Sequence, residues 1–142
     1  MPIDGSVVAL DVGSKRIGVA VSDPAGTFAF PHDTIERTNV RDDVAAIVAI
    51  ARERAACVIV VGDPLTMAGT RGIASDNIDA FVAHLARAFD GRIERIDERL
   101  TTAAVQKSLI GADVSRAKRK TVVDKLAAAM ILETYLARAR AS

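Results

Sequence analysis

The sequence predicts an α/β domain in which helices flank a central mixed sheet of five strands. Residues 57–61 form an apolar run without alternation, which is typical of a strand covered by helices on both faces. Residues 7–12 and 17–22 form two further apolar runs joined by a short turn that contains Gly13, so we expect them to pair as an antiparallel hairpin. With 142 residues, the chain is long enough to bury a core, and we expect one domain over residues 1–142.

The first three predicted strands follow one another through short turns and form an antiparallel meander. After the hairpin, residues 23–26 predict a turn because Asp, Pro and Gly occur together. Residues 27–30 favour a third strand, which we expect Pro31 to end because proline has no backbone N–H. Farther along, residues 92–97 alternate between charged and apolar side chains, which predicts an edge strand with one solvated face. The strands predicted over residues 57–61 and 92–97 are expected to be parallel members of the sheet.

Four segments have the features of helices. Residues 42–54 carry apolar side chains at helical spacing and two acids in the first turn, where carboxylates interact favourably with the helix dipole. Similar spacing predicts helices over residues 74–89 and 121–138, and a shorter helix over residues 101–110. The polar and basic residues 111–120 are expected to be mobile. Three strands, helix, strand, helix, strand and two helices is the element order of the ribonuclease-H-like fold.

The composition is that of an ordinary globular protein, with 50% hydrophobic and 26% charged residues. The chain contains no apolar run of transmembrane length and no N-terminal signal segment, so we expect a cytoplasmic protein without a membrane partner. The single cysteine, Cys57, cannot form an internal disulfide, and its place at the start of an apolar run predicts a buried, unreactive thiol.

Charge is distributed unevenly along the chain. The net charge is only +1, yet from Arg99 onward there are nine basic and three acidic residues, so the preceding part is net acidic. This asymmetry indicates a polyanionic partner for the C-terminal part. The chain has one Tyr, four Phe and no Trp, and so few aromatic side chains give no indication of base stacking on single strands.

Acidic residues lie at the ends or starts of three predicted elements. Asp11 ends the first strand, the pair Asp97 and Glu98 follows the last strand, and Asp124 lies in a helix that is apolar nearly all round. Mg²⁺ and Mn²⁺ take oxygen ligands and are often held by one or two carboxylates together with water and substrate phosphate. Two such ions activate water and stabilise the leaving oxygen in phosphodiester cleavage. The acids therefore predict a divalent metal site.

Structural roles compete with this interpretation. Asp11 could accept hydrogen bonds from backbone N–H groups of the turn, and Asp124 could pair with Lys120, Lys125 or another neighbour near its helix N-terminus. Other catalytic chemistries have less support. The two histidines, His32 and His84, lack metal-ligand spacing, and no Ser lies in the sequence context of a nucleophile elbow.

Four motifs occur in the order in which they occur in the YqgF/RuvX family, and together they cover nearly the whole chain. The chain resembles that family in Asp11-x-Gly13-x-Lys15-x-Ile17-Gly18-Val19-Ala20, Val61-Gly62-x-Pro64-Leu65-x-Met67-x-Gly69-Thr70, Asp97-Glu98-Arg99-Leu100-Thr101-Thr102 and Val123-Asp124-x-x-Ala127-Ala128. Two positions depart from the family pattern: Asp63 stands where an apolar residue is usual, and Thr66 where Asn is common.

The resemblance implies a nuclease of the ribonuclease-H-like fold that uses Mg²⁺ or Mn²⁺, with two ions held by Asp11, Glu98 and Asp124. It also implies maturation of the 5′ end of precursor 16S rRNA in the bacterial cytoplasm, with Holliday junction resolution on DNA as the alternative. Asp63 and Asp97 stay open as further metal ligands, although adjacent side chains on a strand point to opposite faces, which favours Glu98 over Asp97.

Two functions of other classes remain. One is a non-catalytic nucleic-acid-binding factor of ribosome assembly, which the three acids argue against. The other is a phosphotransferase of the actin and sugar-kinase type, which needs two such domains and an adenosine site, more than this chain provides.

Basic residues near the acids are expected to bind the phosphate backbone of a nucleic acid, RNA in preference to DNA. Such contacts give affinity without sequence readout and make binding strongly dependent on salt. For residues 116–120 the alternative is a solvated loop. The oligomeric state, monomer or homodimer, is open, and a resolvase that cuts two strands symmetrically would need the dimer. The predicted contacts are Lys15, Arg16, Arg71, Arg99, Arg116, Lys118, Arg119 and Lys120.

Overall fold

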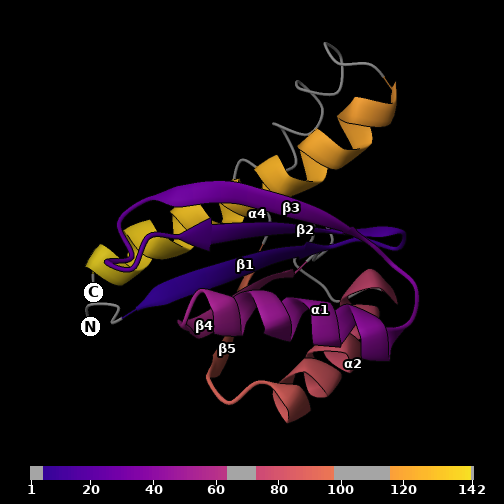
Figure 1. Cartoon of the computed structure of the whole chain (residues 1–142), viewed down its shortest axis with the longest axis horizontal. Coiled ribbons are helices and arrows are strands. Elements are labelled where there is room, and N and C mark those ends of the chain that lie inside the picture. The colour runs from indigo at the N-terminus through magenta and orange to yellow at the C-terminus, as the bar shows by residue number, and fades with distance from the viewer. Residues whose placement is uncertain (1–4, 64–72, 98–115, 142) are drawn as a thin grey trace.

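The computed structural model describes residues 5–63, 73–97 and 116–141. Over these ranges the strands and helices follow the predicted order, with strands in the first third and helices alternating with strands after it (Figure 1). The elements are β1 (Ser6–Val12), β2 (Arg16–Ser22), β3 (Ala29–Glu36), α1 (Val40–Glu53), β4 (Ala56–Asp63), α2 (Ile73–Ala88), β5 (Arg92–Asp97) and α4 (Arg116–Ala141).

The five strands form one mixed sheet in the order β3-β2-β1-β4-β5. Strand β1 pairs with β2 in antiparallel orientation and with β4 in parallel orientation. Strand β3 continues the antiparallel meander, and β5 lies parallel to β4 at the other edge. The predicted ribonuclease-H-like architecture is confirmed, and β1, which ends at the predicted site, is the central strand.

Helices cover both faces of this sheet (Figure 1). On one face, Val8 and Leu10 of β1 pack with buried residues of α1 and α2. On the other face, Val7 and Ala9 pack with α4. Because side chains alternate along a strand, each central strand contributes to both cores. The same division explains the uninterrupted apolar run of β4.

Three details differ from the sequence prediction. Strand β3 runs through Pro31 to Glu36, and the β2–β3 register shifts beside it, between Val19 and Ala20. Proline is tolerated there because β3 is an edge strand with one unpaired side. Helix α4 begins at Arg116, so residues 116–120 are helical and not a mobile loop. Arg, Lys and Ala are good helix formers, which accounts for the extension.

Two other expectations are tested only in part. Cys57 is half-buried rather than fully buried, and its thiol donates to the carbonyl of Ser6 at 3.5 Å. The predicted helix over residues 101–110, and residues 111–115, lie outside the described residues. Within the described part of the chain, no helix has the length and apolar character needed to cross a lipid bilayer.

Candidate active site

Asp11 lies near the end of the central strand, on the face covered by α4. It follows Val7 and Ala9 in the alternation of β1, and both of these pack against that helix. Its exposed fraction is only 7%, which is low for an acidic residue. Directly across the β1–β2 ladder, Asp11 pairs with Gly18. A carboxylate buried this deeply in a central strand needs a hydrogen-bond donor or a cation beside it.

At Gly18 the backbone of α4 comes very close to the sheet. A Cβ atom at Gly18 would lie 1.9 Å from the backbone carbonyl oxygen of Asp124, so a larger residue has no room. Neighbouring contacts are also small, since Ala20, Ala127 and Ala128 are almost fully buried between helix and sheet. The helix backbone therefore sits directly on β2. Asp11 and Asp124 are thereby brought to the same face of the sheet, one strand apart.

The side chain of Asp124 is held by Arg16 at the start of β2. Nε of Arg16 donates to Oδ2 of Asp124 at 2.8 Å. Both side chains are mostly buried, with exposed fractions of 21% for Arg16 and 17% for Asp124. The sequence predicted Lys120 or Lys125 as the competing partner of Asp124, whereas the observed partner is 108 residues away. Arg16 thus supplies a cation beside Asp124, and its predicted contact with phosphate stays a prediction.

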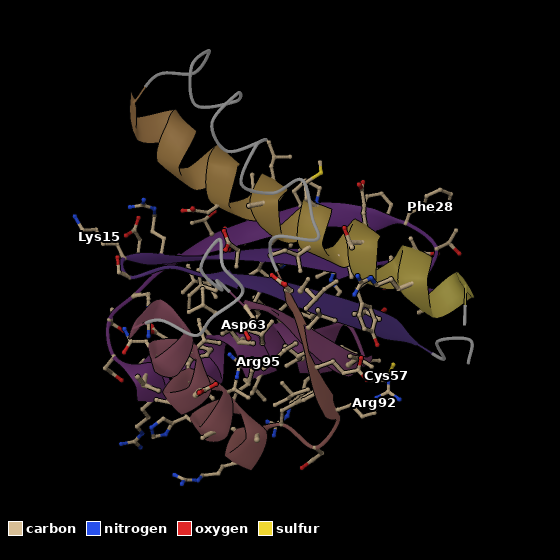
Figure 2. All side chains as sticks on the ribbon, turned by 180° about the vertical axis from the view of Figure 1, so that it is seen from behind. Lys15, Phe28, Cys57, Asp63, Arg92 and Arg95 are labelled. Atoms are coloured by element: carbon tan, nitrogen blue, oxygen red, sulfur yellow. The ribbon has the colours of Figure 1, made fainter. Side chains whose placement is uncertain are left out.

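The hairpin that carries Arg16 is fixed by backbone contacts at its tip. The amide of Gly13 donates to the carbonyl of Arg16 at 2.9 Å, which closes the turn between β1 and β2. Lys15 is exposed at this tip and extends away from the sheet (Figure 2). This position leaves the Lys15 ammonium accessible to an anionic ligand beside the acidic pair.

Arg37, which the sequence analysis did not single out, anchors the same hairpin. Its amide donates to the carbonyl of Lys15, and its Nη1 donates to the carbonyl of Gly13, each at 2.9 Å. Its Nε donates to Oδ2 of Asp43 at 3.2 Å, and its guanidinium lies 5.3 Å from the ring centroid of Phe81. Arg37 therefore ties the hairpin tip to both α1 and α2.

Asp43 completes this anchor from the first turn of α1. Its exposed fraction is 2%, and its second oxygen accepts from the amide of Thr38 at 3.1 Å. A buried acid is costly unless it is paired and hydrogen-bonded, and both conditions are met here. The sequence alone indicates only that Asp43 interacts favourably with the helix dipole. Its position directly before Val44, where the buried stripe begins, is the feature that indicates burial.

Asp63 and Asp97 lie on the opposite face of the sheet from Asp11. They face each other in the β4–β5 register and follow the alternation of Ile59 and Val61, which pack towards α1 and α2. Nη2 of Arg95 lies 3.2 Å from Oδ1 of Asp63, and the same guanidinium contacts Asp79 of α2 (Figure 2). The geometry thus gives Asp63 an ion-pairing role away from Asp11.

The remaining predicted site residues fall in parts that the structure does not describe. Glu98, Arg71 and Arg99 lie outside the described ranges, as do the side chains of Arg116, Lys118, Arg119 and Lys120. Among the described residues, no group of three or more His, Cys, Asp or Glu side chains is arranged to hold a metal ion. Two carboxylates on one face still fit Mg²⁺ or Mn²⁺, which need only one or two.

Known proteins resemble this chain over most of its length. Residues 5–138 match the model of a family described as "RuvX: Holliday junction resolvase". The chain belongs to the RuvX family. A RuvX-family relative from Clostridium perfringens (strain SM101 / Type A) is 46% identical over 132 residues, which cover 93% of this chain and 96% of the relative. One from Rhodopseudomonas palustris (strain TIE-1) is 45% identical over 137 residues, covering 96% and 86%. Both are named "Putative pre-16S rRNA nuclease".

A solved structure shares the fold. "T. thermophilus RuvC in complex with Holliday junction substrate" superposes with a TM-score of 0.60 at 14% identity, covering 94% of this chain and 95% of that one. The sheet order and the helices on both faces agree with that match. This RuvX-family chain is therefore a phosphodiester-hydrolysing nuclease with a ribonuclease-H-like fold.

Proposed function

We propose that this RuvX-family chain is a divalent-metal-dependent nuclease that matures precursor 16S rRNA in the bacterial cytoplasm. The observation that carries the proposal is that Gly18, the ladder partner of Asp11, touches the backbone of Asp124, which puts the two acids on the same face of the sheet. The substrate is inferred from relatives at 45 and 46% identity that are named for it.

Asp11, Glu98 and Asp124 would hold Mg²⁺ or Mn²⁺ in this proposal. Support for Glu98 comes from β5, since Ile96, two residues before it, packs in the core on the α4 side of the sheet. When bound, a pair of such ions would supply an activated water and neutralise charge on the departing oxygen. Arg16 orients the carboxylate of Asp124 through their ion pair.

The basic residues give the proposed nucleic-acid contacts. Helix α4 is continuous from Arg116 to Asp124, so the basic run begins about 12 Å along the helix axis from the acid. Lys15 lies at the tip of the hairpin that also carries Arg16. Contacts of this kind to phosphates position a nucleic acid without reading its sequence.

The test is a cleavage assay with RNA that spans the 5′ end of 16S rRNA, beside single-stranded DNA and a four-way DNA junction. Cleavage of the RNA is expected with Mg²⁺ or Mn²⁺ and not with EDTA. Asp11→Asn should abolish it without unfolding the protein. Preferential cutting of the junction would favour the resolvase function that the family description names.

Asp63→Asn provides a matched control, because it replaces an equally buried strand-end carboxylate on the opposite face. We expect this variant to retain cleavage per folded molecule. Equal loss of cleavage in both variants would contradict the assignment of the site to the α4 face. Full activity of Asp11→Asn would contradict the proposed metal ligands altogether.

A further inference from the structure

A groove of about 410 Å³ lies between α1 and α2, on the face of the sheet away from Asp11 and Asp124. Its floor is aliphatic and is formed by Val40, Val44 and Val48 of α1, of which Val44 and Val48 are core residues with 5% of their surface exposed. Small exposed residues, Ala45 and Ala88, leave it open to solvent. Its volume lies within the range of small binding pockets, about 300–1,000 Å³.

Positive charge surrounds this floor. Arg41 and Arg52 of α1 and Arg87 of α2 line the groove together with His84, and all four side chains are exposed. No acidic residue belongs to the lining. Among the residues that the structure describes, none of the three guanidinium groups forms an ion pair. The groove is therefore a channel with a small aliphatic floor and exposed arginines along its sides.

We propose that this groove binds an amphipathic helix of a partner protein, with apolar side chains on the valine floor and acidic side chains against the three arginines. Helices bind such grooves through apolar residues at i, i+3, i+4 and i+7. Complementary charge around the groove speeds association and selects the partner. Among the described residues, His84 is the one aromatic ring in the lining, and no Phe, Tyr or Trp accompanies it as a platform for successive bases, so a peptide fits the groove better than single-stranded RNA.

The site is separate from the proposed nuclease site. Asp11 lies under α4 and Asp124 belongs to that helix, and the sheet stands between both residues and the groove. A bound helix would thus leave the RNA site open. The inference does not depend on the proposed substrate, because it rests on the lining of the groove alone.

The test uses the full chain and a fluorescent synthetic helix with leucines at i, i+4 and i+7 flanked by glutamates. A scrambled peptide of equal composition and a short single-stranded RNA serve as the other probes. We expect the amphipathic peptide to bind at least about tenfold more tightly than the scrambled one, a difference of about 1.4 kcal/mol. Equal affinity for the two peptides, or no binding up to about 1 mM peptide, would overturn the proposal.

Two variants separate the apolar and ionic contributions. Ala45→Trp fills the groove and should abolish peptide binding, whereas Ala49→Trp, at an exposed alanine outside the lining, should not. The double variant Arg41→Glu, Arg87→Glu should weaken binding about tenfold or more, and Arg54→Glu, outside the lining, should change it little. Nuclease activity should be unchanged in all four.

Binding of the RNA probe in the groove would contradict the peptide proposal. If the RNA probe bound, lost affinity in the double arginine variant and kept it in Ala45→Trp, the groove would be a nucleic-acid surface and the peptide proposal would be wrong. A steep decrease of affinity with salt would accompany that outcome.

Discussion

Nε of Arg16 lies 2.8 Å from Oδ2 of Asp124 and joins the β1–β2 hairpin to helix α4. This contact places a cation beside Asp124, on the face of the sheet that also carries Asp11, because Asp11 lies across the ladder from Gly18 and Gly18 touches the backbone of Asp124. It also makes Arg16 a competitor of any metal ion for the oxygens of Asp124.

Removal of this cation should make the protein more dependent on divalent ions. Arg16→Ala is expected to lower the free energy of unfolding by about 1 kcal/mol in EDTA, since a partly buried ion pair is lost. Mn²⁺ should then raise the melting temperature of the variant more than that of the wild type, because an ion bound to the native state takes over charge neutralisation. Thermal unfolding with and without Mn²⁺ measures this. An equal or smaller Mn²⁺ effect in the variant would show that Arg16 does not share its role with a cation.

The contact between Gly18 and α4 should tolerate no side chain. Gly18→Ala would place a methyl group against the backbone oxygen of Asp124, and backbone on both sides leaves nothing to rotate away. We expect a loss of about 2 kcal/mol or more in the free energy of unfolding and a large decrease in nuclease activity.

Ala20→Gly, on the same strand and face, is the control and should lower the free energy of unfolding by about 1 kcal/mol while activity persists. Urea denaturation and cleavage assays distinguish the two. Native stability in Gly18→Ala would mean that α4 does not lie on β2 as described.

Arg37 and Asp43 should behave as a coupled pair. Arg37→Ala leaves the buried carboxylate of Asp43 without its guanidinium, and we expect destabilisation of about 3 kcal/mol. The hairpin tip also loses its contact through Gly13, so cleavage should decrease as well. In a double-mutant cycle, Arg37→Ala combined with Asp43→Ala should be less destabilised than the sum of the single variants. Additive effects in denaturant unfolding would contradict an energetic link between hairpin and helix.

Asp23 should make stability depend on pH in the acidic range. The amide of Phe28 donates to its carboxylate at 2.7 Å and holds the pKa of Asp23 below its ordinary value, an effect that desolvation opposes and a further bond from the amide of Thr27 reinforces. Because the folded-state pKa is the lower one, this stabilisation is fully present above the unfolded-state pKa of about 3.9 and is lost as pH falls through the folded-state pKa.

Wild type and Asp23→Asn measure this effect by difference. The stability advantage of the wild type should grow as pH rises from roughly 2 to 5 and stay constant above that range. Urea denaturation at several pH values gives the difference directly, since the other acids titrate in both proteins. A difference that does not change with pH would show that the loop does not perturb Asp23.

The order of strands and helices was predictable because it depends on local patterns. The apolar run of β4 and the alternation of β5 are properties of short segments, and both elements were confirmed. The end of β3 was not predictable, since tolerance of Pro31 depends on the edge position that the strand takes in the finished sheet. The start of α4 was missed because a run of charge was given more weight than the helix propensity of Arg, Lys and Ala.

The candidate site shows the same division between local and long-range information. Asp11 and Asp124 could be proposed from position and family resemblance, but their neighbours could not. Arg16 meets Asp124 across 108 residues, and Arg37 meets the carbonyl of Gly13 across 24. Contacts of this range leave no periodic signal in the sequence. Asp97 lies on the face opposite Asp11, whereas the preference for Glu98 over Asp97 stays a prediction, because Glu98 lies outside the described residues.

The seating of α4 on Gly18 has a consequence for when the enzyme becomes active during its synthesis. The hairpin leaves the ribosome long before the helix does, since Arg16 and Asp124 are 108 positions apart. A nascent chain that lacks α4 has Asp11 but not Asp124, and the face of its sheet that α4 covers is exposed. Catalytic competence would therefore begin only once the helix has emerged and docked.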